Sequence, residues 1–245
     1  MNFMAWTLIR IDFTETCECI FGEKKHYITC GKGYVVVNNE GIEAFCGPQC
    51  AKNSKYVTNP NEKVPDFTKG CLVIDVKEQT QSTFNPHSDD KSPSQINNQK
   101  SDYINAISYL LLRVEKLKHY PQMRYKKLSD IYGKYLSGQL DNIDINFLLM
   151  LGESSIYPEF SYQNLQAIYA CDFWINQFLK QNANKDTSFV KEIKSYLVAN
   201  LALTPSQIKG LNRWFDNTEG KKIVNIKPNA FAIDPTTYWK NKFKK

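Results

Sequence analysis

The spacing of hydrophobic residues changes along the chain from a strand-like to a helix-like period. Near the N-terminus, residues 4–13 and Tyr34–Val37 are rich in β-branched and aromatic residues, which favours strands. Residues 38–41 (NNEG) have the composition of a turn and Ile42–Phe45 returns after them, so the sequence predicts a β-hairpin. Residues 71–76 (CLVIDV) predict a further short strand.

Helical spacing takes over after residue 100. Thr204 is a clear helix start, because it can cap the first turn, Pro205 suits the first helical position and Gln207 closes a capping box. Apolar stripes at intervals of three and four residues, together with such start signals, predict five or six helices. They cover residues 104–117, 123–136, 143–151, 161–179, 189–201 and 204–215.

Between these regions, residues 78–100 contain one aromatic and almost no aliphatic residues. Such a segment cannot offset the entropy cost of ordering, so we expect a flexible linker or a long surface loop. The sequence therefore predicts an α+β fold. It comprises a β-rich module over 1–77, the linker over 78–100, an all-helical bundle over 101–220 and a basic, aromatic tail over 221–245.

The amino-acid composition restricts the classes of protein to which this chain can belong. Hydrophobic residues make up 42% of the 245 residues and aromatic residues 13%, enough to build a core, so wholesale disorder is not expected. No run approaches the roughly 18 apolar residues of a membrane span, and Met1–Phe13 lacks the pattern of a signal peptide. We expect a soluble, cytoplasmic protein with no membrane partner.

Seven cysteines are present, and five of them fall between Cys17 and Cys50. A tight local cluster in an intracellular chain favours metal ligands over disulfides. In the run from Phe45 to Cys50 (FCGPQC), a hairpin delivers Cys46, and Cys50 would lie one turn into a short helix whose N-terminus favours thiolates. Cys30 precedes a glycine at the other end of the hairpin, as in a zinc knuckle. The alternative is a set of buried thiols without metal.

These residues resemble a treble-clef zinc finger of the TRASH, or YHS-like, group, whose second knuckle reads F-C-S-x-x-C. The likeness covers about residues 15–52 and rests on Phe45, Cys46, Gly47 and Cys50. It implies one structural zinc ion. The chain departs from the family in the first knuckle, which lacks a C-x2-C pair ending at Cys30. The candidate ligands are Cys17, Cys19, Cys30, Cys46 and Cys50. Cys17 or Cys19 is favoured as the fourth ligand over His26, and four such ligands leave no open position for catalysis.

A nuclease-like string is also present. Pro65-Asp66, followed by Asp75 and Lys77, matches the P-D-x(n)-D-x-K pattern, in which two carboxylates hold Mg²⁺ and a lysine positions water. The short gap and the adjoining linker argue against this interpretation, and such patterns arise often by chance. We expect a non-enzymatic protein.

Charge points to a polyanion partner. The net charge is +6, and residues 221–245 carry seven lysines against one acid. A solvated tail is the alternative. Basic residues beside aromatic ones suggest phosphate contacts and base stacking. The candidates for nucleic-acid contact are Arg124, Lys126, Lys127, Lys134, Lys209, Arg213, Lys221, Lys222, Lys240 and Lys242.

The favoured function is therefore non-catalytic binding of DNA or RNA, as one subunit of a complex with other proteins. In size and order of parts, the chain is similar to the zinc-finger-bearing large subunit of type IV CRISPR effector complexes. That likeness implies a role in antiviral defence, reading the motif that flanks the target while the guide RNA reads the sequence. A protein–protein adaptor is the alternative of a different class.

Overall fold

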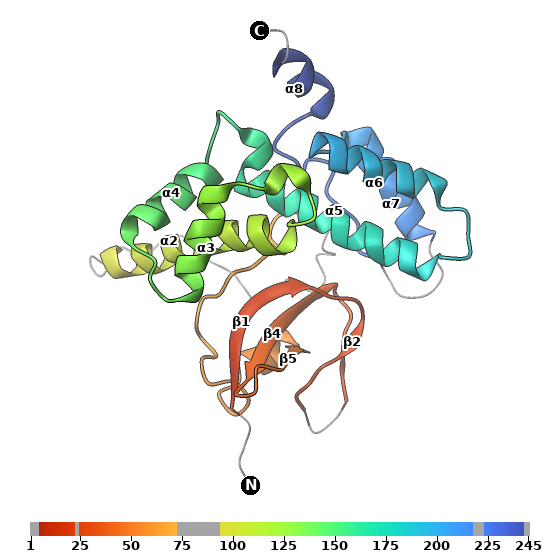
Figure 1. Cartoon of the computed structure of the whole chain (residues 1–245). Coiled ribbons are helices and arrows are strands. Elements are labelled where there is room, and N and C mark those ends of the chain that lie inside the picture. The colour runs from red at the N-terminus through yellow and green to blue at the C-terminus, as the bar shows by residue number, and fades with distance from the viewer. Residues whose placement is uncertain (1–4, 23–24, 73–93, 218–222, 243–245) are drawn as a thin grey trace.

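The computed structural model describes residues 5–22, 25–72, 94–217 and 223–242. A small antiparallel β-module lies at one end of the molecule, and a layer of helices covers it (Figure 1). The helix α8 (Pro235–Lys242) lies beyond that layer, at the far end from the sheet. The α+β class predicted from the sequence is thus confirmed at the level of its elements.

The β-module contains two sheets. The first has the order β1–β4–β5, with β1 (Trp6–Phe13), β4 (Lys32–Asn38) and β5 (Glu43–Cys46) all antiparallel. The second is the hairpin of β2 (Cys17–Glu18) and β3 (Tyr27–Ile28). Behind β5 comes the short helix α1 (Pro48–Ala51). The predicted strand and hairpin are therefore confirmed.

Five helices lie close to their predicted positions, whereas α2 (Ser94–Leu111) begins ten residues before the predicted start at Ile104 and α8 was not predicted. The bounds of the five are α3 (Lys126–Leu136), α4 (Asn142–Gly152), α5 (Tyr162–Gln181), α6 (Ser188–Asn200) and α7 (Pro205–Asp216). Three short turns complete the layer: the π-turn η2 (Leu112–Lys116) and the 3₁₀ turns η3 (Pro121–Met123) and η4 (Pro158–Phe160). The capping box predicted at the start of α7 is present, with Thr204 and Gln207 each bonding the other's backbone N–H.

The helical core forms around α5, whose Trp174 and Ile175 are fully buried. The β-module contributes to the same core. Phe13, at the end of β1, packs with its ring centroid 5.4 Å from Tyr169 and 5.5 Å from Phe173. A second, smaller core lies within the β-module and includes Val36 and Cys46. The module is therefore fixed to the helices by shared apolar packing.

A buried ionic network reinforces this junction. The carboxylate of Asp12 on β1 accepts hydrogen bonds from the Lys116 ammonium at 2.5 Å and from the Tyr169 hydroxyl at 2.7 Å. Arg10 bridges Asp12 and Glu43. A buried carboxylate costs free energy unless it is paired and hydrogen-bonded, and Asp12 is both.

The structure shifts the predicted boundaries of the linker and of the C-terminal tail. Residues 73–93, which hold most of the expected linker and most of the strand expected at 71–76, lie outside the described residues. The helix α2 begins at Ser94, inside the expected linker. In the expected tail, Ile223, Val224 and Ile226 are buried, and Ile226 bridges to Leu72. That part of the C-terminal segment belongs to the packed structure, because its apolar residues reach the core.

Candidate metal centre

The β2–β3 hairpin places Cys19 opposite His26. The strand register pairs Cys17 with Ile28 and Glu18 with Tyr27, and it continues because the Cys19 N–H donates to the His26 carbonyl at 3.0 Å. Directly opposed residues in an antiparallel pair lie side by side. The hairpin therefore presents a thiol and an imidazole together, across the seven positions that separate them in the sequence.

The end of β5 and the start of α1 supply the other side of the site. Cys46 ends β5 and is fully buried, and Cys50 lies in α1, one helical turn later. The Ile20 N–H donates to the Phe45 carbonyl at 3.0 Å, which ties the hairpin to β5. The Gly47 N–H donates to the Cys19 sulfur at 3.3 Å, an amide–sulfur contact that stabilises a thiolate.

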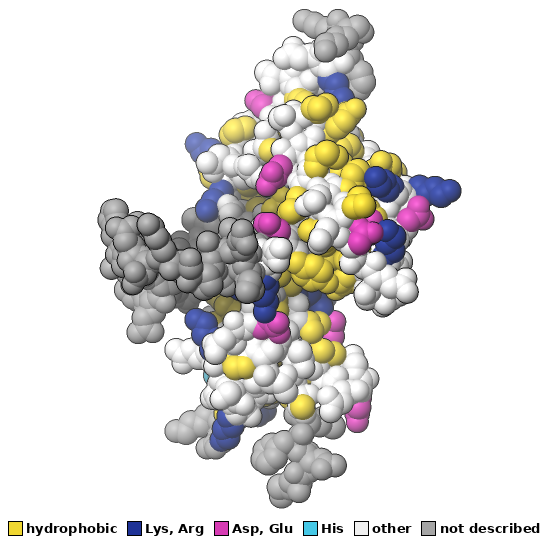
Figure 2. Space-filling view, turned by 90° about the vertical axis from the view of Figure 1, so that its left-hand side faces the viewer, with side chains coloured by type: hydrophobic (Ala, Val, Ile, Leu, Met, Phe, Trp, Pro, Cys, Tyr) yellow, Lys and Arg dark blue, Asp and Glu magenta, His cyan; other side chains and the backbone are white. Residues whose placement is uncertain are grey.

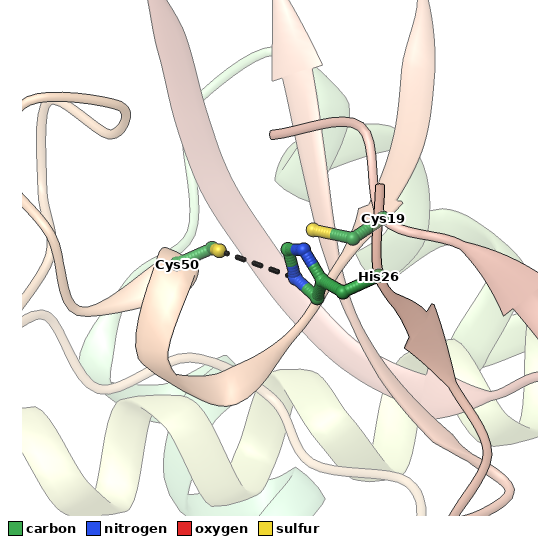
Figure 3. Close-up of side chains that lie close together, drawn as sticks. All are labelled: Cys19, His26 and Cys50. Carbon is green, nitrogen blue, oxygen red and sulfur yellow. Dashed lines mark hydrogen bonds between the residues drawn. The ribbon is translucent and has the colours of Figure 1, made fainter. Parts of the chain in front are cut away.

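The ligand atoms of Cys19, His26 and Cys50 all lie within 4.8 Å of one another, close enough to bind one metal ion. Figure 3 shows both cysteine side chains pointing toward the imidazole. The Cys50 sulfur is 3.5 Å from Nε2 of His26. Tetrahedral zinc, with Zn–S of about 2.3 Å and Zn–N of about 2.0 Å, would hold these two atoms about 3.5 Å apart. The donor set and this spacing fit zinc.

Cys46 lies beside the same group. Burial, followed by the nearby Cys19 and Cys50, raises the pKa of the Cys46 thiol to about 12. Burial and Cys19 raise the pKa of Cys50 to about 11. Such thiols stay protonated at neutral pH unless a cation replaces the proton, which is how a metal ion binds cysteines. The Cys46 thiol lies near Cys19 and Cys50, but its sulfur is not among the ligand atoms that all lie within 4.8 Å of one another.

The structure does not bring Cys17 or Cys30 into this group of three. The Cys30 thiol donates to the Lys32 carbonyl at 3.3 Å, and the Cys17 sulfur lies 3.4 Å from the Thr14 hydroxyl. The glycine of the predicted Cys30 knuckle, Gly31, instead lies against Trp174 and Val224. The group contains both Cys19, one of the two cysteines expected as the fourth ligand, and His26, the alternative to them, because the hairpin register pairs the two residues.

The basic residues predicted to bind nucleic acid divide into three sets. Arg124, Lys126, Lys209, Arg213 and Lys240 are exposed, and none forms an ion pair with a carboxylate of the described residues. Lys127, Lys134 and Lys242 are engaged: by the Phe147 ring at 3.5 Å, by Asp144 at 2.7 Å and by Glu159 respectively. Lys221 and Lys222 lie outside the described residues.

Only part of the nuclease-like string lies among the described residues. Both carboxylate oxygens of Asp66 are engaged, one by Lys32 at 3.0 Å and the other by Thr68 at 2.6 Å. Asp75 and Lys77 lie outside the described residues.

The burial of one charged residue could not be predicted from the sequence. Arg113 is buried, with 5% of its surface exposed, and it lines a small pocket together with Lys118 and Arg124. Arg113 lies in an apolar helical stretch, but this position does not predict its burial, because a polar residue beside a core stripe is equally compatible with an exposed position.

The fold and the site thus define an α+β chain with a Cys/His cluster in its β-module. Comparison with models of known protein families, with curated proteins and with solved structures gives no significant match. Among the described residues, no helix is long and apolar enough to cross a membrane.

Proposed function

We propose that this protein is a non-catalytic nucleic-acid-binding protein whose β-module is organised by one structural zinc ion. The observation that supports nucleic-acid binding is the set of five exposed basic side chains defined above that have no carboxylate partner among the described residues. Such cations lose little when they approach phosphates, and they release counterions from the nucleic acid.

Zinc would be held by Cys19, His26, Cys46 and Cys50. Three sulfurs and one nitrogen form a closed tetrahedral set, which suits a structural rather than a catalytic ion. The ion would join the hairpin to α1, two pieces that share a small core. Because this core is small, metal binding would contribute a large share of the module's folding free energy.

The expected contact residues on α3 allow a matched test. Lys126 and Lys134 lie on the same helix and both are exposed, but only Lys134 is neutralised, by Asp144 and Asp141. We would measure binding of the zinc-loaded protein to duplex DNA, single-stranded DNA and RNA by fluorescence anisotropy across a salt series.

Lys126→Ala should weaken binding and lower the salt slope by about 0.7 to 0.9 for each phosphate that Lys126 neutralises. Lys134→Ala, with the same change in formal charge, should weaken binding less. No binding of any of the three nucleic acids at low salt would overturn the proposal.

We also propose that the chain works within a nucleoprotein assembly. Its net charge is only +6, and several basic side chains are neutralised internally, which suits a subunit that shares the nucleic acid with other proteins. The type IV CRISPR effector complex, to which the layout is similar, is one assembly of this kind. Co-purification that nuclease digestion abolishes, together with sequencing of the bound nucleic acid, would test this setting.

An adaptor function is favoured by a different observation. Large apolar side chains are exposed around α4, with Ile143 at 78%, Met150 at 60% and Leu136 at 66%. Figure 2, which views the left-hand side of Figure 1, shows hydrophobic side chains among charged ones over the helical part of the molecule. Contiguous exposed apolar surface often marks a protein interface. An adaptor function predicts a complex that survives high salt and nuclease digestion and is abolished by Ile143→Glu.

A further inference from the structure

A pocket with a basic lining lies between the end of the α2–η2 helix and the start of α3. Its volume is about 190 Å³, and its lining includes three basic residues, Arg113, Lys118 and Arg124, with Met123, Tyr125 and Ser129. A water molecule occupies about 30 Å³ of liquid, so the pocket has room for a ligand several times larger. No acidic residue lines it among the described residues.

Arg113 gives the pocket a buried positive charge. One terminal nitrogen of its guanidinium donates to the Tyr109 hydroxyl at 3.0 Å, and the other donates to the Met123 carbonyl at 3.2 Å. The Phe160 ring lies 4.5 Å from the guanidinium carbon. None of these partners is an anion, and Nε is buried with no hydrogen-bond partner among the described residues. A buried charge without a counter-ion is costly, so the site is electrostatically incomplete in the part of the chain described.

A local irregularity of the helix puts Arg113 there. At Leu111 the α-helix gives way to the π-turn η2, where the Leu117 N–H donates to the Leu112 carbonyl at 2.9 Å. Within this one turn, Lys116 reaches Asp12 in the β-module while Arg113 lines the pocket. π-turns are uncommon and frequently occur at functional sites.

The start of α3 adds a second favourable feature. Its N-cap residue, Tyr125, makes no side-chain capping hydrogen bond, and its first turn contains no acidic residue. The first backbone N–H groups of a helix have no partner within the helix, and they attract anions. Tyr125 and Ser129, which belong to this end of α3, both line the pocket.

We propose that this pocket binds a phosphate group of a nucleic-acid strand, with Arg113, Lys118 and Arg124 as its cations. Arginine suits phosphate because its planar N–H donors match the oxygens. Tyr125, 44% exposed, stands at the rim and offers a ring on which an adjoining base stacks. This inference deepens the proposed function, on which it rests, by assigning it a site.

The test uses the full chain, and its main variants change exposed residues so that folding is preserved. The double variant Lys118→Ala/Arg124→Ala removes two pocket charges. Its matched control, Lys69→Ala/Lys191→Ala, removes two exposed lysines that do not line the pocket. Tyr125→Ala removes the stacking ring. Each is titrated with a labelled single-stranded oligonucleotide by anisotropy across a salt series and, separately, with inorganic phosphate by calorimetry.

The pocket variant should bind the oligonucleotide about tenfold more weakly than the control, with a salt slope lower by about 0.7 for each phosphate that its two side chains neutralise in the wild type. Tyr125→Ala should weaken binding by about fivefold or more, the effect of removing one base stack. Arg113→Lys keeps the charge but removes the planar donors, and with an unchanged melting temperature it should also weaken binding.

The outcomes separate the two proposals. If the wild-type protein binds the oligonucleotide and the pocket variant matches the control, the pocket is overturned and the function stands. If inorganic phosphate binds in an Arg124-dependent manner but no nucleic acid does, the phosphate chemistry of the pocket stands and the nucleic-acid source and function fail. If neither ligand binds, both proposals fail.

Discussion

Cys19 and His26 form a directly opposed pair on the β2–β3 hairpin, joined by the hydrogen bond from the Cys19 N–H to the His26 carbonyl at 3.0 Å. Their side chains meet Cys50 of α1 on one side of the β-module (Figure 3). The sequence does not show this relationship directly, because strand register, and not a fixed motif spacing, brings the two ligands together.

Replacing a ligand should release the metal ion, and replacing an uninvolved cysteine should not. We expect His26→Ala and Cys50→Ser to lose the single equivalent of zinc measured by elemental analysis. Their β-module should unfold at a lower temperature, because zinc in small domains contributes on the order of 10 kcal/mol of folding free energy. Cys30→Ser is the control and should keep its zinc. Equal zinc content in Cys50→Ser and Cys30→Ser would contradict the assignment.

The sequence was sufficient where the signal is local. Thr204 and Gln207 lie close together in the chain and specify the start of α7 by their own hydrogen bonds. The Cys46–Cys50 spacing likewise depends on a single turn. By contrast, the pairing of His26 with Cys19 required the hairpin register, and the choice among Cys17, Cys19 and His26 could not be made without it.

Long-range relationships were beyond sequence reasoning for the same reason. Asp12 meets Lys116, 104 residues away, and Tyr169, 157 residues away. Nothing near Asp12 in the chain indicates that it is buried. The π-turn at Leu112–Lys116 also had no signal, since no glycine or proline interrupts that helical stripe.

Breaking the Asp12 network should destabilise the whole protein. Asp12→Ala leaves the Lys116 ammonium, 17% exposed, without its carboxylate partner. Removing one partner of a buried ion pair typically costs about 3–5 kcal/mol, and we expect a loss of that order in urea unfolding. Glu62→Ala breaks the exposed pair with Lys100 and should cost at most about 1 kcal/mol. Similar losses in the two variants would mean that the network does not fix the junction.

The protein should lose stability at alkaline pH. Burial raises the pKa of Tyr162 from its ordinary value of 10.0 to about 12, and burial raises the pKa of Tyr109 in the same direction. A phenol with a raised folded-state pKa binds its proton more tightly in the folded state. Its stabilising contribution is therefore complete below pH 10 and is lost as the pH rises toward 12.

We expect the free energy of unfolding to fall as the pH rises above about 10, by up to about 1.4 kcal/mol per pH unit for each such tyrosine. Urea unfolding at a series of pH values measures this slope. Tyr162→Phe cannot ionise there, so its slope should be smaller. An identical pH dependence in wild type and Tyr162→Phe would contradict the burial argument.

Two glycines with the same backbone conformation provide a controlled test of the contact between module and bundle. Gly31 has φ +75° and Gly41 has φ +79°, a region in which a side chain is strained. A Cβ on Gly31 would lie 2.5 Å from Val224 and 2.8 Å from Trp174, whereas a Cβ on Gly41 would meet nothing within 4 Å. The two alanine variants thus share the strain and differ in the clash.

Gly41→Ala should cost about 1 kcal/mol, the typical penalty for a left-handed non-glycine residue. Gly31→Ala should cost that amount plus about 1–3 kcal/mol for overpacking, because the fully packed Trp174 cannot withdraw. Urea unfolding of both variants measures the difference directly. Near-equal losses would show that Val224 and Trp174 move aside and that the β-module does not lie tightly on α5. A larger loss in Gly31→Ala establishes that contact in solution, because the shared φ strain cancels in the comparison.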